Sequence, residues 1–508
     1  MSHIKPLSSC LLKEVVIRLQ VLDIAGYFPE TVTGISQDSR AIKPGNIFVA
    51  RSGQRVRGLD FVETAKKNGA VLVITDDELP EDPILPMVRV SNIKLALRSF
   101  TLLLYKDYVS KLNIIGLTGT KGKTSSTILL RAVLEFAGYP TGLIGTIHYD
   151  NGVDITPAPN TTPDVDVLHN LFAEMVDNEL SHCVMEVSSH ALELGRVDGI
   201  SISIAGFLNL SREHLDMHNT MEAYFLAKKR MFDSLDENAI AVVNFDSPYG
   251  ERIVHNCKAK RIIFFSKSIE SGADVIWKPV RQDIYGSEYN ITFGETQFNI
   301  VTPLVGTFQG ENLALVVSIA LGMGIPVDVI RDGIAAVKCV PGRMEAISQG
   351  QPFGVYCDYA HAPEPLEQVI SSTRGFCKGR IITLFGCGGD RDRGKRPIMG
   401  RIAAEKSDLV IITSDNSRSE EPADITRMIV EGIPAQLMDK VTVEIDRRKA
   451  IEIAISMAQA GDVVLIAGKG HETYQEEKGV RHSFDDRLVA AEQLRLLGWY
   501  GNDTQPEA

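Results

Sequence analysis

The chain has 508 residues, of which 44% are hydrophobic and 23% are charged, and its formal net charge is −12. This length exceeds what one hydrophobic core normally supports, so we expect roughly three domains. The acidic total argues against a nucleic acid or an anionic membrane as the main partner, although it leaves room for local basic pockets that bind anionic ligands.

The cysteines and the apolar runs indicate a cytoplasmic protein. The seven cysteines are scattered and form no C-x-x-C pair, which fits a reducing compartment and predicts neither a disulfide scaffold nor a zinc site. Residues 1–6 lack the long apolar core of a signal peptide. No run approaches the ~18 apolar residues of a membrane span, so we expect no membrane partner.

Residues 1–108 are predicted to form a small α/β unit. Apolar runs at 47–50 and 70–75 are typical of buried strands, and turns are expected at 43–45 and at Pro83.

Residues 109–337 open with the strongest local signal in the chain, a predicted phosphate loop. Residues 118–125 lie between an apolar run at 112–117 and an apolar-periodic segment at 128–136. A buried strand, a glycine-rich turn and a helix start form a cradle for phosphate, because backbone N–H groups and the helix N-terminus both face the anion. The predicted ATP-binding residues are Gly119, Thr120, Lys121, Gly122, Lys123, Thr124 and Ser125.

Two side chains of this loop have predicted roles. Lys123 would reach the outer phosphates, and Thr124 would offer its hydroxyl oxygen to Mg²⁺. A strict G-x-x-x-x-G-K-S/T pattern nevertheless misses the loop, because Leu117 stands where the first glycine should be. That departure points to a family with its own form of the motif.

Candidate metal ligands follow the next predicted strands, at 184–187 and 202–207. Glu186 ends the first of them; a carboxylate beside a phosphate loop in one sheet would suit Mg²⁺, and an ordinary strand-end residue is the alternative. Asn209 and His214 follow the second strand and could join the ion. His214 also begins an H-x-x-x-H pattern, but a zinc-protease site needs glutamate directly after it, and the chain has leucine there.

A lysine interrupts the apolar face of the helix predicted over 221–235. Lys228 lies four residues after Tyr224 and three before Met231, which places it in the apolar stripe. One interpretation is a lysine that extends its ammonium into solvent. The other is a desolvated amine of lowered pKa, nucleophilic towards carbon dioxide, whose carbamate would be an extra carboxylate beside Mg²⁺.

Residues 338–508 repeat an alternation of strand, loop and helix. Helix-length segments such as 396–406 and 446–459 separate apolar runs. Four of these runs lead into polar or glycine-rich loops, over 355–361, 381–391, 409–418 and 463–472. This alternation predicts a parallel sheet, with ligands at the carboxyl ends of its strands. The chain as a whole is therefore predicted to be α/β.

The segment 390–396 is dense in cations and follows a glycine-rich turn. A solvated charge run is the usual explanation, but its place at the end of a strand favours a role in anion recognition. A dinucleotide fingerprint starting at Gly386 fails, because Arg391 stands where its last glycine should be. Nicotinamide chemistry is therefore not supported.

Together these motifs resemble the Mur ligase family, and within it the members that add the third amino acid. The family form of the phosphate loop, T-G-T-x-G-K-S/T-S/T, matches the chain where the strict form fails. Independent matches span nearly the whole chain, at 38–40, 161–163, 186–190, 228, 341–345, 358–361, 388–397, 415–418 and 468–472.

The resemblance implies three domains with separate tasks. Residues 1–108 would bind the uridine nucleotide, 109–337 would form a central P-loop ATPase with a parallel-rich sheet, and 338–508 would form a Rossmann-like domain for the amino acid. By position, the UDP-substrate would be held by Ser39, Gln54, Arg55, Val56, Asn160, Thr161, Thr162, Ser188 and Arg196. ATP would also contact Asn312, Arg343 and Asp358.

The resemblance further implies an ATP-dependent ligation in peptidoglycan precursor synthesis. The D-Glu carboxylate of UDP-N-acetylmuramoyl-L-Ala-D-Glu would become an acyl phosphate and be attacked by meso-diaminopimelate, with ATP and Mg²⁺ as cofactors. The implied catalytic residues are Lys123, Glu186, His214 and Lys228. The implied metal ligands are Thr124, Glu186, His214 and Lys228, the last as N6-carboxylysine. We expect a monomer whose partners are these small molecules.

The choice of amino acid would depend on Arg418. Family members that add meso-diaminopimelate carry D-N-P-R, whose arginine binds the distal carboxylate, and lysine-adding members usually lack it. This chain keeps the arginine and has Ser417 in place of proline, which loosens the loop more than it changes the chemistry. A guanidinium matches a carboxylate and disfavours an amine. The implied pocket comprises Arg391, Asp415, Asn416, Arg418, Gly468 and Glu472.

Alternatives of two kinds remain at this stage. The same ligation with L-lysine, or another ATP-dependent amide ligase of the superfamily, would share the loop and Lys228, but the latter should lack the paired Asp-Asn-x-Arg and Gly-Lys-Gly-His-Glu motifs. A nucleotide switch that binds partners without ligation is an alternative of a different class. The chain has no N-K-x-D guanine motif to support it.

Overall fold

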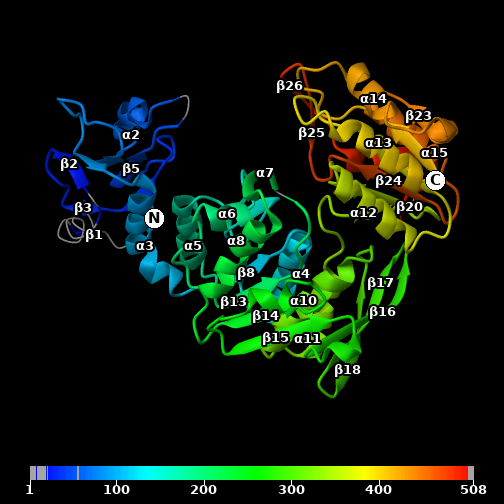
Figure 1. The fold of residues 1–508 in the computed structure, drawn as a ribbon, viewed down its shortest axis with the longest axis horizontal. Helices are drawn as coiled ribbons and strands as arrows, with labels where there is room; N and C mark the ends of the chain where they lie inside the picture. Colours follow the sequence, from blue (N-terminus) through cyan, green and yellow to red (C-terminus); the bar gives the residue numbers. More distant parts are fainter. Residues whose placement is uncertain (1–6, 9–18, 20, 54–55, 214, 502–508) are drawn as a thin grey trace, which may run out of the picture. The chain divides into compact units, whose positions relative to one another are not determined.

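The computed structural model describes residues 7–8, 19, 21–53, 56–213 and 215–501. These residues form two compact units, and Figure 1 labels many of their elements. The first unit comprises the described residues of 1–123, 138–243 and 247–262, and the second those of 124–137, 244–246 and 263–501. Within the described part of the chain, no helix is both long and apolar enough to span a bilayer.

A five-stranded sheet occupies the N-terminal part of the first unit, in the order β2-β7-β6-β5-β4. Its β2–β7 pair is antiparallel, and its other neighbours are parallel. Successive side chains of a strand face opposite sides, so Val49 packs towards α3 and Phe48 towards α2. The elements are β1 (Leu7–Ser8), β2 (Val21–Ala25), β3 (Thr31–Val32), β4 (Gly34–Ser36), β5 (Asn46–Ala50), the 3₁₀ helix η1 (Gly58–Phe61), α2 (Val62–Lys67), β6 (Leu72–Thr75), β7 (Met87–Val90) and α3 (Ile93–Val109).

The larger sheet of the first unit has the order β11-β10-β9-β12-β8-β13-β14. Its strands from β9 to β14 in this order run parallel, while β10 and β11 are antiparallel. The carboxyl ends of β12, β8 and β13 therefore lie side by side. The elements are β8 (Asn113–Thr118), β9 (Thr141–Ile144), β10 (His148–Asp150), β11 (Ile155–Pro157), α5 (Val165–Asp177), β12 (His182–Glu186), α6 (Ser189–Glu193), β13 (Ile204–Phe207), α7 (Leu215–His218), α8 (Met221–Asp233), β14 (Ile240–Asn244) and α9 (Gly250–Ile253).

The second unit begins with helix α4, which follows the loop after β8, and continues with the strand order β15-β16-β17-β18. The β15–β16 pair is parallel, and β16, β17 and β18 form an antiparallel meander. The elements are α4 (Lys123–Phe136), β15 (Arg261–Ser266), the 3₁₀ helix η2 (Ile269–Ser271), β16 (Val275–Asp283), β17 (Gly286–Phe293), β18 (Thr296–Thr302), α10 (Gln309–Gly322) and α11 (Val327–Ala336).

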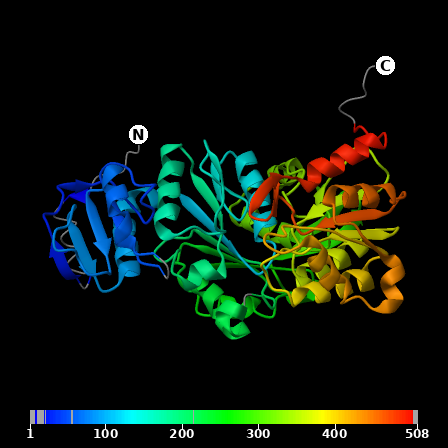
Figure 2. The same cartoon turned by 90° about the horizontal axis from the view of Figure 1, so that it is seen from above.

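A six-stranded sheet follows in the same unit, in the order β19-β20-β24-β21-β22-β23. All its neighbours are parallel except the β19–β20 pair. Figure 2 shows helices on both sides of this sheet, in the part coloured yellow to red. The elements are β19 (Glu345–Ala346), β20 (Gly354–Asp358), α12 (Pro363–Arg374), β21 (Ile381–Phe385), α13 (Lys395–Lys406), β22 (Leu409–Ile412), α14 (Pro422–Val430), the 3₁₀ helix η3 (Ala435–Lys440), β23 (Val441–Val443), α15 (Arg447–Ser456), β24 (Val463–Ala467), β25 (Tyr474–Glu477), β26 (Val480–Ser483) and α16 (Asp486–Leu496).

The alternation of apolar side chains explains why this sheet is covered on both faces. Ile381 and Phe385 pack in one core with helices α12, α13 and α14, whereas Ile382 and Leu384 pack in a second core with α15 and α16. Because both faces are buried, the strands read as continuous apolar runs in the sequence. The predicted α/β class is confirmed, and so is the parallel sheet predicted for the last third. The antiparallel pairs β16–β17, β17–β18 and β25–β26 were not predicted.

Candidate active site

The phosphate loop connects the central strand β8 to helix α4, as predicted. Its Gly122 has φ +87°, a left-handed conformation that favours glycine. The second residue after β13, Asn209, holds the loop on its other side. Asn209 accepts the Thr120 N–H with its backbone oxygen, at 2.9 Å, and the Lys121 N–H with its side-chain oxygen, at 3.0 Å. The loop is therefore held at the carboxyl end of the sheet by a neighbouring strand.

The ammonium of Lys123 lies on this loop. Its Nζ donates to the backbone oxygens of Gly119, at 2.8 Å, and Thr120, at 3.1 Å. Lys123 is the first residue of α4, so its positive charge lies at the N-terminus of the helix. The free backbone N–H groups of the first helical turn point in the same direction. This arrangement favours the binding of an anion at the loop.

Lys228 is buried at the same place, with 1% of its surface exposed. Its Nζ donates to the Gly119 oxygen at 3.0 Å and to Thr118 Oγ1 at 3.4 Å, and lies 4.8 Å from the ring centroid of Tyr224. Burial, and then the charge of Lys123, hold the pKa of Lys228 well below its ordinary value of 10.5. The alternative of a lysine that reaches solvent is therefore wrong. Lys228 is a desolvated amine of lowered pKa, as the second interpretation predicted.

Glu186 ends β12, next to the phosphate-loop strand, and is 1% exposed. Its Oε1 accepts the Thr146 N–H at 2.8 Å, and its Oε2 accepts the Thr146 hydroxyl at 3.1 Å. Gly145 has no room for a side chain, because a Cβ there would stand 2.7 Å from Glu186 Oε1. The carboxylate is thus oriented by a turn that the sequence did not single out.

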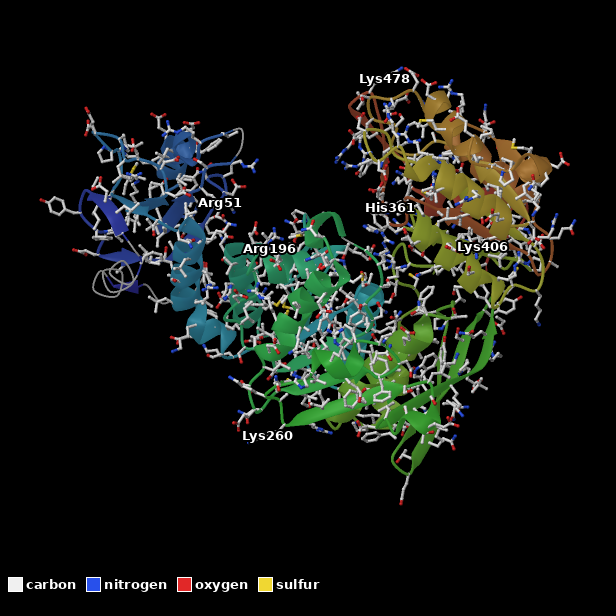
Figure 3. All side chains as sticks on the ribbon, in the orientation of Figure 1. Arg51, Arg196, Lys260, His361, Lys406 and Lys478 are labelled. Atoms are coloured by element: carbon white, nitrogen blue, oxygen red, sulfur yellow. The ribbon has the colours of Figure 1, made fainter. Side chains whose placement is uncertain are left out.

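Four of the residues predicted to hold the UDP-substrate gather around the same strand end. Thr162 donates its hydroxyl to the Glu186 backbone oxygen at 2.7 Å, and Arg196 donates to the Thr162 backbone oxygen at 2.8 Å. Thr161 lies 3.1 Å from the Thr146 hydroxyl. Ser188 receives a contact from Thr162 at 3.4 Å and caps α6. Figure 3 labels Arg196 among these side chains.

The other described residues predicted to hold the UDP-substrate are Asn160, Ser39 and Val56. Asn160 accepts a hydrogen bond from the Tyr149 hydroxyl with its backbone oxygen. Ser39 and Val56 lie on loops of the five-stranded sheet, not on the sheet that carries the phosphate loop; Ser39 is buried and Val56 is 49% exposed.

In the second unit, Asp358 ends β20 and holds the turn that carries Arg343. Its carboxylate accepts the N–H groups of Met344, at 2.9 Å, and Ala360, at 2.8 Å. Burial raises the pKa of Asp358, and the charge of Arg343 opposes that shift. The Arg343 guanidinium lies 5.5 Å from the ring centroid of Tyr359. A cation and an aromatic face are therefore placed together beside a buried carboxylate.

Asn312, the third residue predicted to contact ATP from this unit, lies on α10. It is 2% exposed and donates to the side-chain oxygen of Gln309 at 3.0 Å.

The residues predicted for the incoming amino acid come together on two loops of the six-stranded sheet. Asn416 donates to Glu472 Oε2 at 2.9 Å. Lys469, which is 0% exposed, donates to Asn416 Oδ1 and to Glu472 Oε2, both at 3.2 Å. Lys469 thus joins the loop after β22 to the loop after β24 through a buried charge with an anionic partner.

Asp415 lies behind this network. Burial by itself would raise the pKa of its carboxyl, but the charges of Arg447 and Lys469 hold the pKa below its ordinary value. Gly468 has φ +114°, and a Cβ there would stand 2.9 Å from Asp415 Oδ2. Glycine is therefore required where the two loops meet.

Arg418 and the cation-rich segment form the outer side of the same region. Arg418 Nη1 donates to the Gly389 oxygen at 2.7 Å, and Arg391, on that loop, is exposed. Arg396 is 0% exposed and binds both carboxylate oxygens of Glu420, at 2.8 and 3.0 Å. This pair, with Arg396 as the largest cause, lowers the pKa of Glu420 to about 2. The explanation of a solvated charge run is wrong for Arg396, which braces the loop.

Comparisons with known proteins agree with this geometry. Three family models match the chain: "Mur ligase family, catalytic domain" over residues 31–102, "Mur ligase middle domain" over 117–320 and "Mur ligase, glutamate ligase domain" over 342–470. A relative from Solibacter usitatus (strain Ellin6076), named UDP-N-acetylmuramoyl-L-alanyl-D-glutamate--2,6-diaminopimelate ligase, is 40% identical over 92% of this chain and 94% of its own length. The chain belongs to the Mur ligase family.

Two further relatives carry the same name. The one from Clostridium perfringens (strain 13 / Type A) is 39% identical over 95% of this chain and 99% of its own length. A solved structure of a ligase so named is 33% identical, has a TM-score of 0.68, and covers 94% of this chain and 97% of its own. The predicted family and its three-domain α/β architecture are confirmed.

In this Mur ligase, some predicted site residues cannot be located in the structure, and two residues at the site were not predicted. Gln54, Arg55 and His214 lie outside the described residues. Thr146 was missed, because no motif marks it. Lys469 was also missed as a site residue, although it stands inside the Gly-Lys-Gly-His-Glu motif.

Proposed function

We propose that this chain is an ATP-dependent ligase that joins meso-diaminopimelate to the D-Glu carboxylate of UDP-N-acetylmuramoyl-L-Ala-D-Glu. The names of its relatives support the reaction. The choice of acceptor is carried by one observation, the place of Arg418. Its guanidinium donates to the Gly389 oxygen, and its backbone lies on the loop after β22, the same loop whose Asn416 donates to Glu472. A planar cation there suits a distal carboxylate and opposes the ammonium of L-lysine.

The first chemical step takes place at the phosphate loop in this proposal. Residues 119–125 hold the triphosphate of ATP, and Lys123 neutralises charge as the γ-phosphoryl group passes to the substrate carboxylate. The amine of the acceptor then attacks the acyl phosphate, and phosphate leaves. The cations of the site stabilise the tetrahedral oxyanion. Asn312, Arg343 and Asp358 contact ATP as well, and Tyr359 adds an aromatic face beside Arg343.

The residues at the loop fit Mg²⁺ by their chemistry. Glu186 and Thr124 offer oxygen donors and are 1% and 6% exposed. In the described part of the chain, no group of three or more His, Cys, Asp or Glu side chains could hold a metal ion without other ligands. That fits a magnesium site completed by substrate phosphates and water. Bound there, Mg²⁺ would neutralise phosphate charge.

His214 is proposed as a further ligand, and Lys228 as a carbamate that supplies another carboxylate. The support for the carbamate is the amine itself, which is buried and has a lowered pKa and is therefore more readily available as a nucleophile than an exposed lysine.

The remaining site residues keep their predicted roles as part of this proposal. The UDP-substrate is held by Ser39, Gln54, Arg55, Val56, Asn160, Thr161, Thr162, Ser188 and Arg196. The acceptor is held by Arg391, Asp415, Asn416, Arg418, Gly468 and Glu472. Domain boundaries at 108/109 and 337/338 are supported by the three family matches, each of which falls inside one domain. We also propose a cytoplasmic monomer, consistent with the free thiols of the six described cysteines.

Phosphate release tests the proposal. The enzyme is given ATP, Mg²⁺ and UDP-N-acetylmuramoyl-L-Ala-D-Glu, with meso-diaminopimelate or L-lysine side by side. We expect phosphate release with meso-diaminopimelate, and a kcat/KM for L-lysine lower by about two orders of magnitude. Turnover with L-lysine alone would overturn the role given to Arg418.

A further inference from the structure

A small hairpin projects from the six-stranded sheet next to Arg418. Its strands β25 and β26 pair antiparallel, with Glu477 opposite Val480, so Lys478 and Gly479 form a two-residue turn. Both turn residues have positive φ, +50° and +76°, which is the signature of a type I′ hairpin turn. Figure 3 labels Lys478 at this turn. A two-stranded hairpin is marginally stable by itself, so its shape depends on what it packs against.

The hairpin packs against the loop that carries the acceptor residues. The Arg418 N–H donates to the Glu476 oxygen at 3.0 Å, and the Lys478 N–H donates to the Arg418 oxygen at 2.6 Å. Arg418 and Glu477 form a parallel bridge between these two bonds. Both backbone polar groups of the arginine are therefore bound by the hairpin.

Two more contacts extend this bracing along the loop. The Glu476 N–H donates to Asn416 Oδ1 at 2.9 Å. The side-chain amide of Gln475 donates to Ser414 Oγ at 2.8 Å and to the Asp415 oxygen at 3.1 Å. The hairpin thus contacts the loop at four of its five residues from 414 to 418.

The loop needs such bracing. Arg418 has φ +53°, a conformation that costs free energy for a residue with a Cβ and persists where the surroundings over-determine it. The preceding residue is Ser417, which leaves its own φ free where a proline would fix it. The hairpin supplies by tertiary contact the rigidity that the loop sequence lacks.

We propose that the β25–β26 hairpin, through Gln475, Glu476 and Lys478, is the positioning element that sets Arg418 for the distal carboxylate of the acceptor. It acts through Arg418 and does not itself touch the reacting atoms. This inference rests on the proposed function for the identity of the acceptor. The bracing of the loop rests on the hydrogen bonds alone.

A matched pair of turn substitutions tests the proposal. Gly479→Val strains the hairpin turn, because a β-branched residue disfavours φ +76°, and no atom lies within 4 Å of its added Cβ. Gly294→Val is the control, since Gly294 has φ +56°, is equally open, and forms the turn between β17 and β18. We expect Gly479→Val to raise the KM for meso-diaminopimelate about tenfold while kcat and the KM values for ATP and the UDP-substrate stay unchanged. Gly294→Val should leave all four parameters unchanged.

The variant Gln475→Ala and amide hydrogen exchange at Arg418 test the same bracing in two further ways. Gln475→Ala removes only the side-chain contacts and should raise the KM for meso-diaminopimelate about threefold. Amide hydrogen exchange of Arg418 should be faster in both hairpin variants than in the wild type and in Gly294→Val. An unchanged KM for meso-diaminopimelate in Gly479→Val, or equal increases in all KM values, would overturn the inference.

Failure of the proposed function is distinguishable from failure of this inference. If the wild type releases no phosphate with meso-diaminopimelate, the proposed function is wrong. The exchange rate of the Arg418 amide then decides by itself whether the hairpin braces the loop; equal rates in all four proteins would refute the bracing.

Discussion

The described residues include two buried lysines, Lys228 and Lys469, whose ammonium groups have opposite kinds of hydrogen-bond partner. Lys228 donates to neutral oxygens, those of Gly119 and Thr118, and shares the first with Lys123. Lys469 donates to Asn416 and to the carboxylate of Glu472. The Lys228 ammonium reaches the carboxyl end of β8 from helix α8, and Lys469 follows the carboxyl end of β24; ligands bind at such strand ends in parallel sheets.

This difference in partners suggests a chemical role for Lys228 and a structural role for Lys469. An ammonium buried without an anionic hydrogen-bond partner is disfavoured relative to the neutral amine, which supports the proposal that Lys228 is modified. A buried ammonium with a carboxylate keeps its charge and fixes two loops relative to each other. In the proposed function, the first site gives up stability for reactivity, and the second uses charge to hold the shape of the proposed acceptor pocket.

The largest effect is expected from Lys228→Ala. Because the carbamate would be lost, we expect the rate of phosphate release to fall about 10³-fold and to recover in part with short carboxylic acids. Lys229→Ala is the control, since the Lys229 ammonium pairs with Asp233 and the backbone oxygen of His255. Wild-type rates in Lys228→Ala would show that this amine has no part in the reaction.

The next effect concerns the acceptor. Arg418→Lys keeps the charge but loses the planar fork, so the KM for meso-diaminopimelate should rise about 10- to 100-fold at an unchanged KM for ATP. Steady-state kinetics with each substrate varied in turn measures this. Equal changes in both KM values would mean that Arg418 supports the fold and does not bind the acceptor.

Removing the charge of Lys469 should destabilise the second unit. Lys469→Met leaves Glu472 without its cation, and we expect a loss of about 2 kcal/mol in the free energy of unfolding, less than for a fully buried pair because Glu472 is partly exposed. Urea denaturation measures the loss. Adding Glu472→Gln should restore part of it, and a double variant no better than the single one would contradict a charge-pair explanation.

Lys228→Met should stabilise the protein, and its effect on the free energy of unfolding should be the smallest of the four effects. Methionine avoids the desolvation of an amine, so we expect a gain of about 1 kcal/mol in the free energy of unfolding near neutral pH. The folded pKa of Lys228 is below the unfolded value of 10.5, so the unfolded chain binds more protons between these two values. Wild-type stability therefore rises with pH through that window, and the advantage of methionine should shrink as the pH approaches 10.5.

Thermal unfolding midpoints of both proteins, followed from pH 7 upward in bicarbonate-free buffer, measure this trend. An advantage that grows with pH would contradict a depressed pKa for Lys228.

Much of the fold was predictable because its signals are local. The apolar runs at 112–117, 381–385 and 463–466 became β8, β21 and β24, since strands buried on both faces need continuous apolar sequence. The hairpins β16–β18 and β25–β26 were missed. Three of the four residues of β25 are only half-buried and β26 is exposed throughout, so they leave a weak apolar pattern.

The phosphate loop, the parallel sheets and the family motifs could be predicted because each is encoded by residues close together in the chain. Which charges are compensated depends instead on contacts that form only in the folded chain. Lys228 meets Thr118 across 110 positions, and Asn416 meets Glu472 across 56. The sequence around a lysine does not show whether its ammonium will be paired. The groups that folding brings to its Nζ determine whether it is an amine of lowered pKa or a fixed cation.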